Sequence, residues 1–237
     1  MLKTLIIGAG DISCHHCAAL SKIKEVKLAG VYDINRDNAE KLASEFGSRV
    51  ADDLETAIRD VDMVHLLTPP SARAEYATLA MRHGKHVFAE SPIALSLPDA
   101  LFMELLAEKT KVKYMVAFTQ RFRKGYELMK ETCQSGALGD AVQFVCVRIG
   151  PGPGFDGKLS ESWRTNPNLV CGMSIESLSN DIDFITSILG GVEDVQASVS
   201  GTIATLPAFD NNSSAVLRIK KRRVCLHRRQ LELGDRL

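Results

Sequence analysis

The chain has 237 residues, of which 45% are apolar, and it carries equal numbers of basic and acidic residues, 29 of each. This composition describes a globular chain long enough for one large or two small domains, and it calls for neither a membrane nor a nucleic acid as partner. The six cysteines lack the short repeating spacings of a disulfide framework, so reduced thiols are expected. The apolar stretch behind Met1 is too short for a signal peptide, and we expect a cytoplasmic protein.

Strand-like and helix-like segments alternate up to about residue 118, which is typical of a parallel sheet covered by helices. In chain order we expect strands at 3–7, 26–33, 62–68, 86–89 and 114–118. Helices are expected from the first glycine turn to about 23, at 36–46, at 72–82, and after 96. Gly47 stands where a left-handed residue ends a helix, and Ser96-Leu97-Pro98-Asp99 has the spacing of a capping box.

Beyond residue 118 the strand-like and helix-like segments no longer alternate regularly. A helix is expected at 125–135, a strand at 141–149, a Pro/Gly-rich loop at 150–154, a long helix at 173–189 and β-rich runs at 192–202 and 214–219. One helix backing several strands indicates an α+β unit. The predicted fold is therefore an α/β domain with a doubly wound parallel sheet over residues 1–118, followed by an α+β domain with a mainly antiparallel sheet over 119–237.

The segment Gly8-Ala9-Gly10-Asp11-Ile12-Ser13 lies where the first strand turns into a helix. The first glycine permits the tight turn, the second lets the backbone approach a pyrophosphate, and the helix N-terminus supplies N–H donors. Asp33, 23 residues beyond Gly10, ends the second strand, where a carboxylate accepts hydrogen bonds from the adenosine ribose. Asp33 should repel a 2′-phosphate, which favours NAD over NADP, although the nearby Arg36 softens this preference. A glycine turn in another α/β fold is the alternative.

With these residues in place, the sequence resembles the Gfo/Idh/MocA family of glucose-fructose oxidoreductases and inositol dehydrogenases, in order from residue 1 to about 220. Residues 84–92, Gly-Lys-His-Val-Phe-Ala-Glu-Ser-Pro, are similar to the family's G-K-H-V-x-x-E-K-P segment. Other similar landmarks are Thr68-Pro69-Pro70-Ser71, Gln120-Arg121-Phe122, Gly136-Ala137-Leu138-Gly139 and Trp163-Arg164-Thr165. The resemblance implies a Rossmann domain, a second domain, and hydride transfer between a nicotinamide and a carbohydrate-like alcohol held between the two.

The resemblance also implies the residues that bind NAD, with NADP as the other possibility. The expected cofactor residues are Gly8, Gly10, Asp11, Ile12, Asp33, Thr68, Pro69 and Glu90. The expected substrate residues are Arg121, Trp163, Arg164 and Asp183. A buried tryptophan that anchors the second domain is the alternative for Trp163.

The proton-transfer residues depart from the family. In the family they are understood to be the lysine of E-K-P and the histidine of a D-x-x-x-H motif. Here Ser91 stands at the lysine position, Glu176 at the aspartate position and Asn180 at the histidine position. A serine hydroxyl is a poor proton acceptor and an amide is none, whereas Glu176 would serve as a base if buried. Two hypotheses remain: an oxidoreductase that uses Glu176 or a bound water, and an inactive dinucleotide-binding paralogue or sensor.

The expected helix at 173–189 has two faces. The apolar stripe comprises Ile175, Leu178, Ile182, Ile185 and Leu189. Glu176, Asn180 and Asp183 form a polar row on the opposite side. The row faces either solvent or a cleft, and the resemblance favours a cleft.

Several other residues have structural or functional alternatives. Cys14-His15-His16-Cys17 contains zinc-ligand types, but no second ligand cluster accompanies it, and we expect no metal. His16, Lys85 and His86 match family positions and are expected to be structural. Arg73 stands where the family often has histidine, which would alter the cofactor or substrate edge.

The C-terminal segment holds seven basic residues between Arg218 and Arg229. No recognition helix or aromatic interleaving accompanies this charge, so a solvated tail is favoured over a nucleic-acid site. The chain is short for the two-domain architecture, and we expect the second sheet to be incomplete. Its open edge would be covered by a second subunit or promote aggregation, and self-association through this sheet is the expected route to a homo-oligomer.

Overall fold

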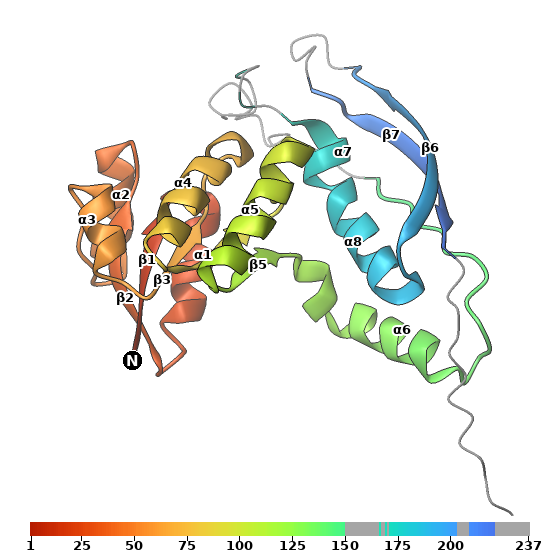
Figure 1. Cartoon of the computed structure of the whole chain (residues 1–237), viewed down its shortest axis with the longest axis horizontal. Coiled ribbons are helices and arrows are strands. Elements are labelled where there is room, and N and C mark those ends of the chain that lie inside the picture. The colour runs from red at the N-terminus through yellow and green to blue at the C-terminus, as the bar shows by residue number, and fades with distance from the viewer. Residues whose placement is uncertain (150–165, 167–168, 170, 203–208, 221–237) are drawn as a thin grey trace, which may run out of the picture.

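The structure is a computed structural model that describes residues 1–149, 166, 169, 171–202 and 209–220. Its centre is a five-stranded parallel sheet, drawn in Figure 1, with the strand order β2-β1-β3-β4-β5. The strands are β1 (Leu2–Ile7), β2 (Val26–Tyr32), β3 (Met63–Leu66), β4 (His86–Glu90) and β5 (Tyr114–Ala117). A parallel bridge between Val31 and Val50 adds a further position beside β2. With this bridge the order is that of the Rossmann fold, in which ligands bind where the chain reverses direction across the sheet, here between β1 and β3.

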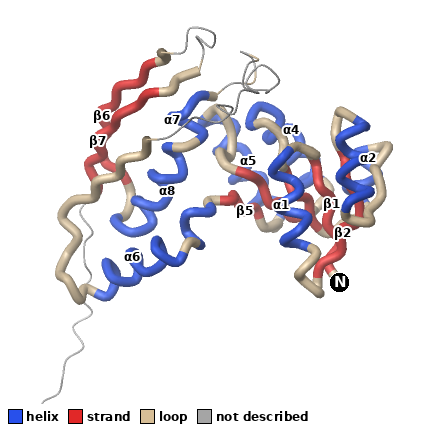
Figure 2. Tube along the Cα trace, turned by 180° about the vertical axis from the view of Figure 1, so that it is seen from behind, coloured by secondary structure: helices blue, strands red, loops and turns tan. Residues whose placement is uncertain are grey.

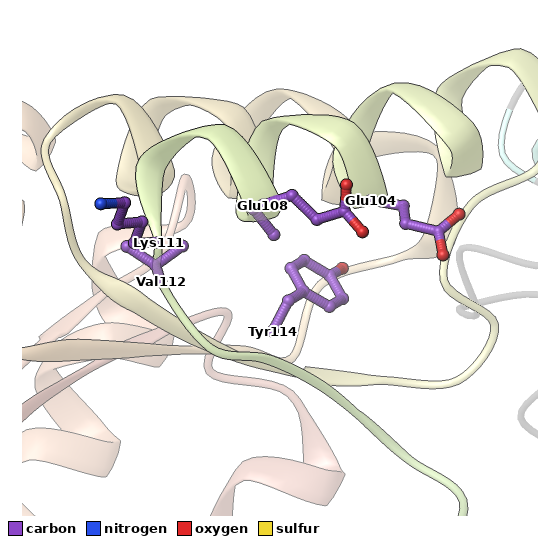
Figure 3. A pocket seen from close by; sticks show the side chains of 6 residues that line it. Glu104, Glu108, Lys111, Val112 and Tyr114 are labelled. Atoms are coloured by element: carbon purple, nitrogen blue, oxygen red, sulfur yellow. The ribbon is translucent and has the colours of Figure 1, made fainter.

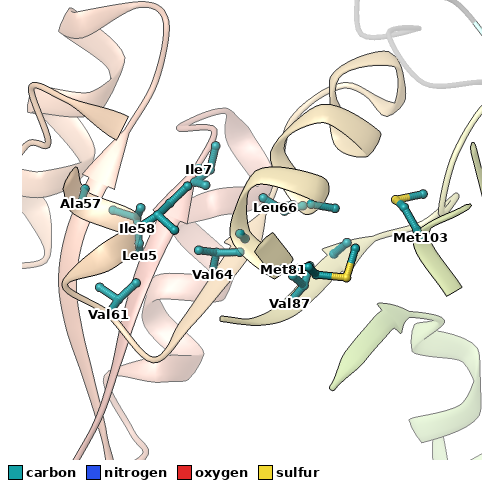
Figure 4. Packing of buried hydrophobic residues seen from close by; sticks show 13 residues of the cluster. Leu5, Ile7, Ala57, Ile58, Val61, Val64, Leu66, Met81, Val87 and Met103 are labelled. Carbon is teal, nitrogen blue, oxygen red and sulfur yellow. The ribbon is translucent and has the colours of Figure 1, made fainter. Parts of the chain in front are cut away.

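Helices cover both faces of this sheet. They are α1 (Asp11–Leu20), α2 (Arg36–Glu45), α3 (Leu54–Arg59), α4 (Pro70–Arg82) and α5 (Leu97–Thr110). Because side chains alternate along a strand, Ile6 packs with α1 and α2, whereas Leu5 and Ile7 pack with α3 and α4 on the other face. Figure 4 shows the second of these cores, and Figure 2 shows α1 and α2 from behind. The alternating helix and strand pattern over residues 1–118 is confirmed.

The remaining elements pack beside this sheet. They are η1 (Thr119–Phe122), α6 (Lys124–Ser135), α7 (Gly172–Glu176), α8 (Leu178–Leu189), β6 (Val192–Ser200) and β7 (Asn212–Ile219). β6 and β7 form a two-stranded antiparallel sheet, as expected. Phe184 of α8 is fully buried, and its ring meets that of Tyr126 in α6 edge-on with centroids 4.5 Å apart. Among the described residues, no helix is both long and apolar enough to cross a membrane.

The strand expected at 141–149 is wrong. Residues 141–149 form no regular element and join no ladder within the described part of the chain. Val142 and Ile149 are 95% and 92% exposed, and among the described residues no strand pairs with this run to satisfy its backbone groups. The expected Pro/Gly-rich loop at 150–154 lies outside the described residues, as does the basic run beyond Lys220.

The single helix expected at 173–189 is also wrong, because α7 ends at Glu176 and α8 begins at Leu178. In a continuous helix the Glu176 carbonyl would accept the backbone N–H of Asn180. Instead the side-chain Nδ2 of Asn180 donates to this carbonyl at 3.1 Å, and the backbone N–H of Asn180 donates to the Ser177 carbonyl at 3.1 Å. A side-chain donor thus replaces the helical bond at the break.

Smaller features of the helices differ from the sequence prediction in two places and agree with it in two others. The most buried side chains of α8 are Asp181, Phe184 and Ile188 rather than the expected apolar stripe, because α6 and Arg148 pack on that face. The six-residue helix α3 was not predicted, since so short an element has little periodicity. Gly47, with φ of 63°, and Ser96, whose Oγ accepts the Asp99 N–H at 3.2 Å, end and begin their helices as predicted.

His65 of β3 makes folding stability depend on pH. Its ring is 6% exposed and stacked on Phe88, with His16 edge-on, and burial lowers its pKa from 6.5 to about 4, with the His16 charge adding to the effect. Between about pH 6.5 and 4, His65 is therefore protonated in the unfolded chain but neutral in the folded chain. Its contribution to folding stability falls as pH drops through this range and levels off below it. The pKa change corresponds to a loss on the order of 3 kcal/mol.

We expect His65→Phe to remove this loss of stability at low pH. The measurement is the free energy of unfolding in urea at pH 7, 6, 5 and 4. The exposed His15→Phe is the matched control and should keep the wild-type dependence. If the unfolding free energies of His65→Phe and the wild-type protein fell equally between pH 7 and 4, His65 would not be the cause of this pH dependence.

Candidate functional site

The glycine loop between β1 and α1 requires its first glycine for steric reasons. Gly8 has φ of +100°, and a Cβ there would lie 2.8 Å from the backbone C and O of Leu67. Ser13, fully buried at the third position of the motif, donates from Oγ to the Gly8 carbonyl at 2.7 Å. The loop is therefore pressed against the end of β3 and fixed from within.

Gly10 presents the opposite situation. It is the residue before the first turn of α1, and a Cβ at Gly10 would meet no atom within 4 Å. Asp11 and Ile12 follow in an exposed first turn, where backbone N–H groups lack helical acceptors. The space beside Gly10 and these donors fits an approaching pyrophosphate.

Asp33 connects the end of β2 to the glycine loop. Its Oδ2 accepts the N–H of Ala9 at 2.6 Å, and its Oδ1 accepts the N–H of Asn35 at 2.8 Å. A carboxylate has about four acceptor positions, so Asp33 retains capacity for a ribose hydroxyl. Arg36 is engaged elsewhere: its guanidinium pairs with Glu40 at 2.7 Å and with Asp52 at 2.6 Å.

Thr68 and Pro69 follow β3, next to the glycine loop. The Oγ1 of Thr68 is buried and has no hydrogen-bond partner within the part of the chain that the structure describes. Pro69 precedes the first turn of α4. The open space at Gly10, the donors of α1 and the unpartnered Thr68 hydroxyl together fit a dinucleotide lying across the ends of β1 and β3.

A polar pocket of about 180 Å³ lies at the same edge of the sheet, beyond the end of β4. Its lining residues are Glu90, Ser91, Ala117, Thr119, Gln120, Arg148, Glu176, Ser177 and Asn180. The structure thus brings together all three residues predicted for catalysis, Ser91, Glu176 and Asn180, and adds Glu90 from the predicted cofactor set.

Glu90 and Ser91 enter the pocket from the end of β4. His16 of α1 places its Nε2 2.9 Å from the Glu90 Oε1, and the Ser91 backbone N–H donates to the Glu90 Oε2 at 3.3 Å. His16 also packs edge-on against Phe88. His16 therefore packs where expected and in addition orients the Glu90 carboxylate.

Glu176 and Asn180 enter from the opposite side. Asp210 caps α7 by accepting from the backbone N–H and the hydroxyl of Ser174, at 2.8 and 2.7 Å, and so fixes the short helix that ends at Glu176. Asn180 donates from Nδ2 to the Ser91 Oγ at 3.3 Å. The side chains at the two departures from the family pattern are thus in contact with each other.

Two bidentate ion pairs connect α8 to neighbouring segments, and one of them includes the pocket residue Arg148. Arg121 of η1 donates twice to Asp183, both at 2.6 Å, and these bonds raise the pKa of Arg121. Arg148 donates to Asp181 at 2.9 and 2.6 Å, which raises the pKa of Arg148. Arg121 and Asp183, both predicted substrate residues, are paired with each other and are not among the pocket-lining residues. The two members of the predicted polar row that lie on α8, Asn180 and Asp183, therefore face other side chains rather than solvent.

Sequence reasoning missed Gln120, Arg148 and Asp181. Gln120 stands beside Arg121 in a recognised motif, and its position there was the available signal. Arg148 interrupts an apolar run, which was a signal, but the run was interpreted only as a strand.

Trp163 and Arg164 lie outside the described residues. Within the described ranges, Cys14-His15-His16-Cys17 forms no cluster that would hold a metal. Lys85 and His86 serve the backbone: Lys85 donates to the Arg59 carbonyl at 2.8 Å, and the His86 Nδ1 accepts the Lys113 N–H at 3.1 Å.

A larger depression of about 430 Å³ lies between α5 and the start of β5. Figure 3 shows Glu104, Glu108, Lys111 and Tyr114 around it. Burial raises the pKa of Tyr114 to about 12. Tyr114 begins β5, whereas the candidate site follows the strand ends, and this depression shares no lining residue with the polar pocket.

Comparison with known proteins agrees with this architecture. Residues 2–118 match the model of the oxidoreductase family with an NAD-binding Rossmann fold, GFO_IDH_MocA. Through this N-terminal part the chain belongs to the Gfo/Idh/MocA oxidoreductase family.

Two curated relatives are informative. Glucose-6-phosphate 3-dehydrogenase of Bacillus subtilis is 35% identical over 140 residues, which cover 59% of this chain and 40% of that protein. Inositol 2-dehydrogenase 3 of Saccharopolyspora erythraea is 32% identical over 152 residues, covering 62% of this chain and 44% of the relative. The chain spans less than half the length of either relative.

A solved structure confirms the fold over a longer range. The scyllo-inositol dehydrogenase of Lactobacillus casei, solved with NAD(H) and scyllo-inositol bound, superimposes with a TM-score of 0.81 at 21% identity. The alignment covers 93% of this chain and 66% of the relative.

Proposed function

We propose that the protein is an NAD-dependent oxidoreductase that moves hydride between a nicotinamide and a secondary alcohol of a sugar, polyol or cyclitol. The observation that carries this proposal is the placement of the Gly8–Ser13 loop and the Glu90, Ser91, Glu176 and Asn180 pocket at one edge of a parallel sheet. The dehydrogenases named above support the substrate class. In this proposal residues 1–118 bind the dinucleotide and residues 119–237 supply much of the substrate side.

The cofactor residues have separate tasks. Gly8 and Gly10 give the pyrophosphate its approach, and the backbone donors of Asp11 and Ile12 bind it. Asp33 binds the ribose, and its charge opposes a 2′-phosphate. Thr68, Pro69 and Glu90 border the nicotinamide side, where the bound ring supplies the hydride acceptor.

The pocket residues handle the alcohol. As the C–H electron pair leaves as hydride, the hydroxyl proton passes to a Glu176 carboxylate oxygen, directly or through a bound water. Ser91 and Asn180 orient the hydroxyl by hydrogen bonds, because neither is a base. Arg121 and Asp183 keep η1 against α8, and Trp163 and Arg164 stay proposed substrate contacts.

The second candidate function is a dinucleotide-binding protein without turnover. The hydrogen bond between Ser91 and Asn180 favours it, since the two side chains satisfy each other where a proton-transfer pair is expected. Calorimetric titration of the folded protein with NADH and NADPH, followed by a panel of polyols and cyclitols with NAD, separates the outcomes. Binding of NADH without turnover across the panel supports this second candidate, and binding of neither nucleotide removes both.

Asp33→Asn is expected to reduce the preference for NADH over NADPH about tenfold, because the charge that faces a 2′-phosphate is lost. The fold should be retained, since the Asn Oδ1 still accepts the Ala9 N–H and only the exposed bond from the Asn35 N–H is lost. The ratio of the two dissociation constants measures this. Asp37→Asn, at an exposed position in the first turn of α2, is the matched control and should leave the ratio unchanged. If Asp33→Asn left the ratio of the NADH and NADPH dissociation constants unaltered, Asp33 would not discriminate between the two nucleotides at the ribose.

A further inference from the structure

Arg73, in the first part of α4, is a buried cation that the proposed chemistry does not use. Its side chain is 5% exposed, and burial lowers its pKa despite partial compensation by Glu90, Tyr114, Cys171 and Glu176. Within the described residues no carboxylate lies within ion-pair distance of its guanidinium. A positive charge near a helix N-terminus is also opposed by the helix dipole. The burial of the Arg73 charge and its position near the helix N-terminus both oppose folding, so neither one stabilises the protein.

The hydrogen bonds of Arg73 explain it better. Its Nε donates to the Thr68 carbonyl at 3.0 Å, and its Nη1 donates to the carbonyls of Glu90 and Pro92 at 2.8 and 2.6 Å. These carbonyls lie at or beyond the ends of β3 and β4, where the ladders stop and backbone acceptors need other partners. The planar guanidinium holds both loops at once, which a single amine or imidazole does less completely.

The two loops are the ones that carry the candidate site. Thr68 adjoins the glycine loop, and Glu90 and Pro92 flank Ser91, whose hydroxyl accepts from Asn180 in the pocket. We propose that Arg73 is a positioning residue that fixes the Ser91 loop against the Thr68 loop and so couples the dinucleotide site to the substrate pocket. The brace itself is independent of the reaction, whereas the coupling rests on the proposed function.

The test compares the full chain with Arg73→Met, which keeps much of the volume without the donors. Hydrogen exchange of peptides covering 66–72 and 88–95 should be faster in both segments, and the dissociation constant for NADH should rise about tenfold. Arg82→Met, at an exposed position of the same helix, is the control and should change neither. Loss of packing alone would lower thermal stability without moving NADH affinity in the folded protein.

Each result decides a separate point. Unchanged exchange in either segment overturns the brace, and faster exchange with unchanged NADH affinity overturns the coupling. If Arg73→Met does not fold, Arg73→Lys, which keeps the charge but loses the planar fork, is judged by the same criteria. If the wild-type protein binds neither nucleotide, the proposed function and the coupling fall together, while the exchange experiment still decides the brace.

Discussion

Replacing Gly8 by alanine is expected to destabilise the fold by about 3 kcal/mol and to abolish dinucleotide binding. The φ of +100° is strained for any residue with a side chain, and the added Cβ would press on the Leu67 backbone from 2.8 Å. No flexible side chain is available to move aside, so the glycine loop or β3 must shift. Urea unfolding and NADH calorimetry measure the two effects.

Gly47→Ala is the matched control for the backbone conformation alone. Gly47 also has a positive φ, +63°, but a Cβ there would meet nothing within 4 Å. The expected cost is about 1 kcal/mol, with NADH binding intact. Equal destabilisation by the two substitutions would contradict the close approach of the glycine loop to the end of β3.

The double variant Ser91→Lys with Asn180→His is expected to raise the rate of NAD-dependent alcohol oxidation about 100-fold, or to create measurable turnover where there was none. The reason is that a lysine and a histidine supply the proton-transfer groups that a hydroxyl and an amide lack, and general acid–base catalysis contributes on this scale. The side chains of Ser91 and Asn180 are already in contact at 3.3 Å, so the new pair would meet in the same pocket. Initial rates with a panel of polyols and cyclitols measure the gain.

The single variants are the controls for this pair. Each is expected to give a smaller gain than the double variant, because residues that act as a unit are not additive. NADH affinity and thermal stability are measured alongside to exclude an indirect cause. An unchanged or lower rate in a folded double variant would mean that the pocket is built for other chemistry.

The N-terminal half was predictable because its signals are local. Apolar runs punctuated by glycine and proline located the strands of the parallel sheet, and the spacing from Gly10 to Asp33 identified a loop and a strand end that the structure brings into contact at Ala9. Ser13 closes the same short segment, and its hydroxyl donates to the Gly8 carbonyl and so holds the glycine loop. The glycine loop, Ser13 and Asp33 all lie within one βαβ unit, from β1 to the end of β2.

The second half was less predictable because its structure depends on distant partners. The β-rich run at 141–149 has the composition of a strand, yet a strand forms only where a neighbour accepts its hydrogen bonds. The break at Ser177 contains no proline, and the Asn180 side chain bonds the Glu176 carbonyl there in place of the helical N–H. Arg148 and Gln120 reach the pocket through tertiary packing, and no spacing in the sequence encodes that proximity.

The hydrogen bond from Ala9 to Asp33 has a kinetic consequence. The carboxylate proposed to bind the ribose also accepts the Ala9 N–H and so holds the glycine loop in place, and an arriving dinucleotide would meet a preorganised surface. Little backbone entropy would then be lost on association, and the association rate would be limited by diffusion and orientation rather than by loop rearrangement. Variation in affinity among nucleotides would accordingly reside in their residence times.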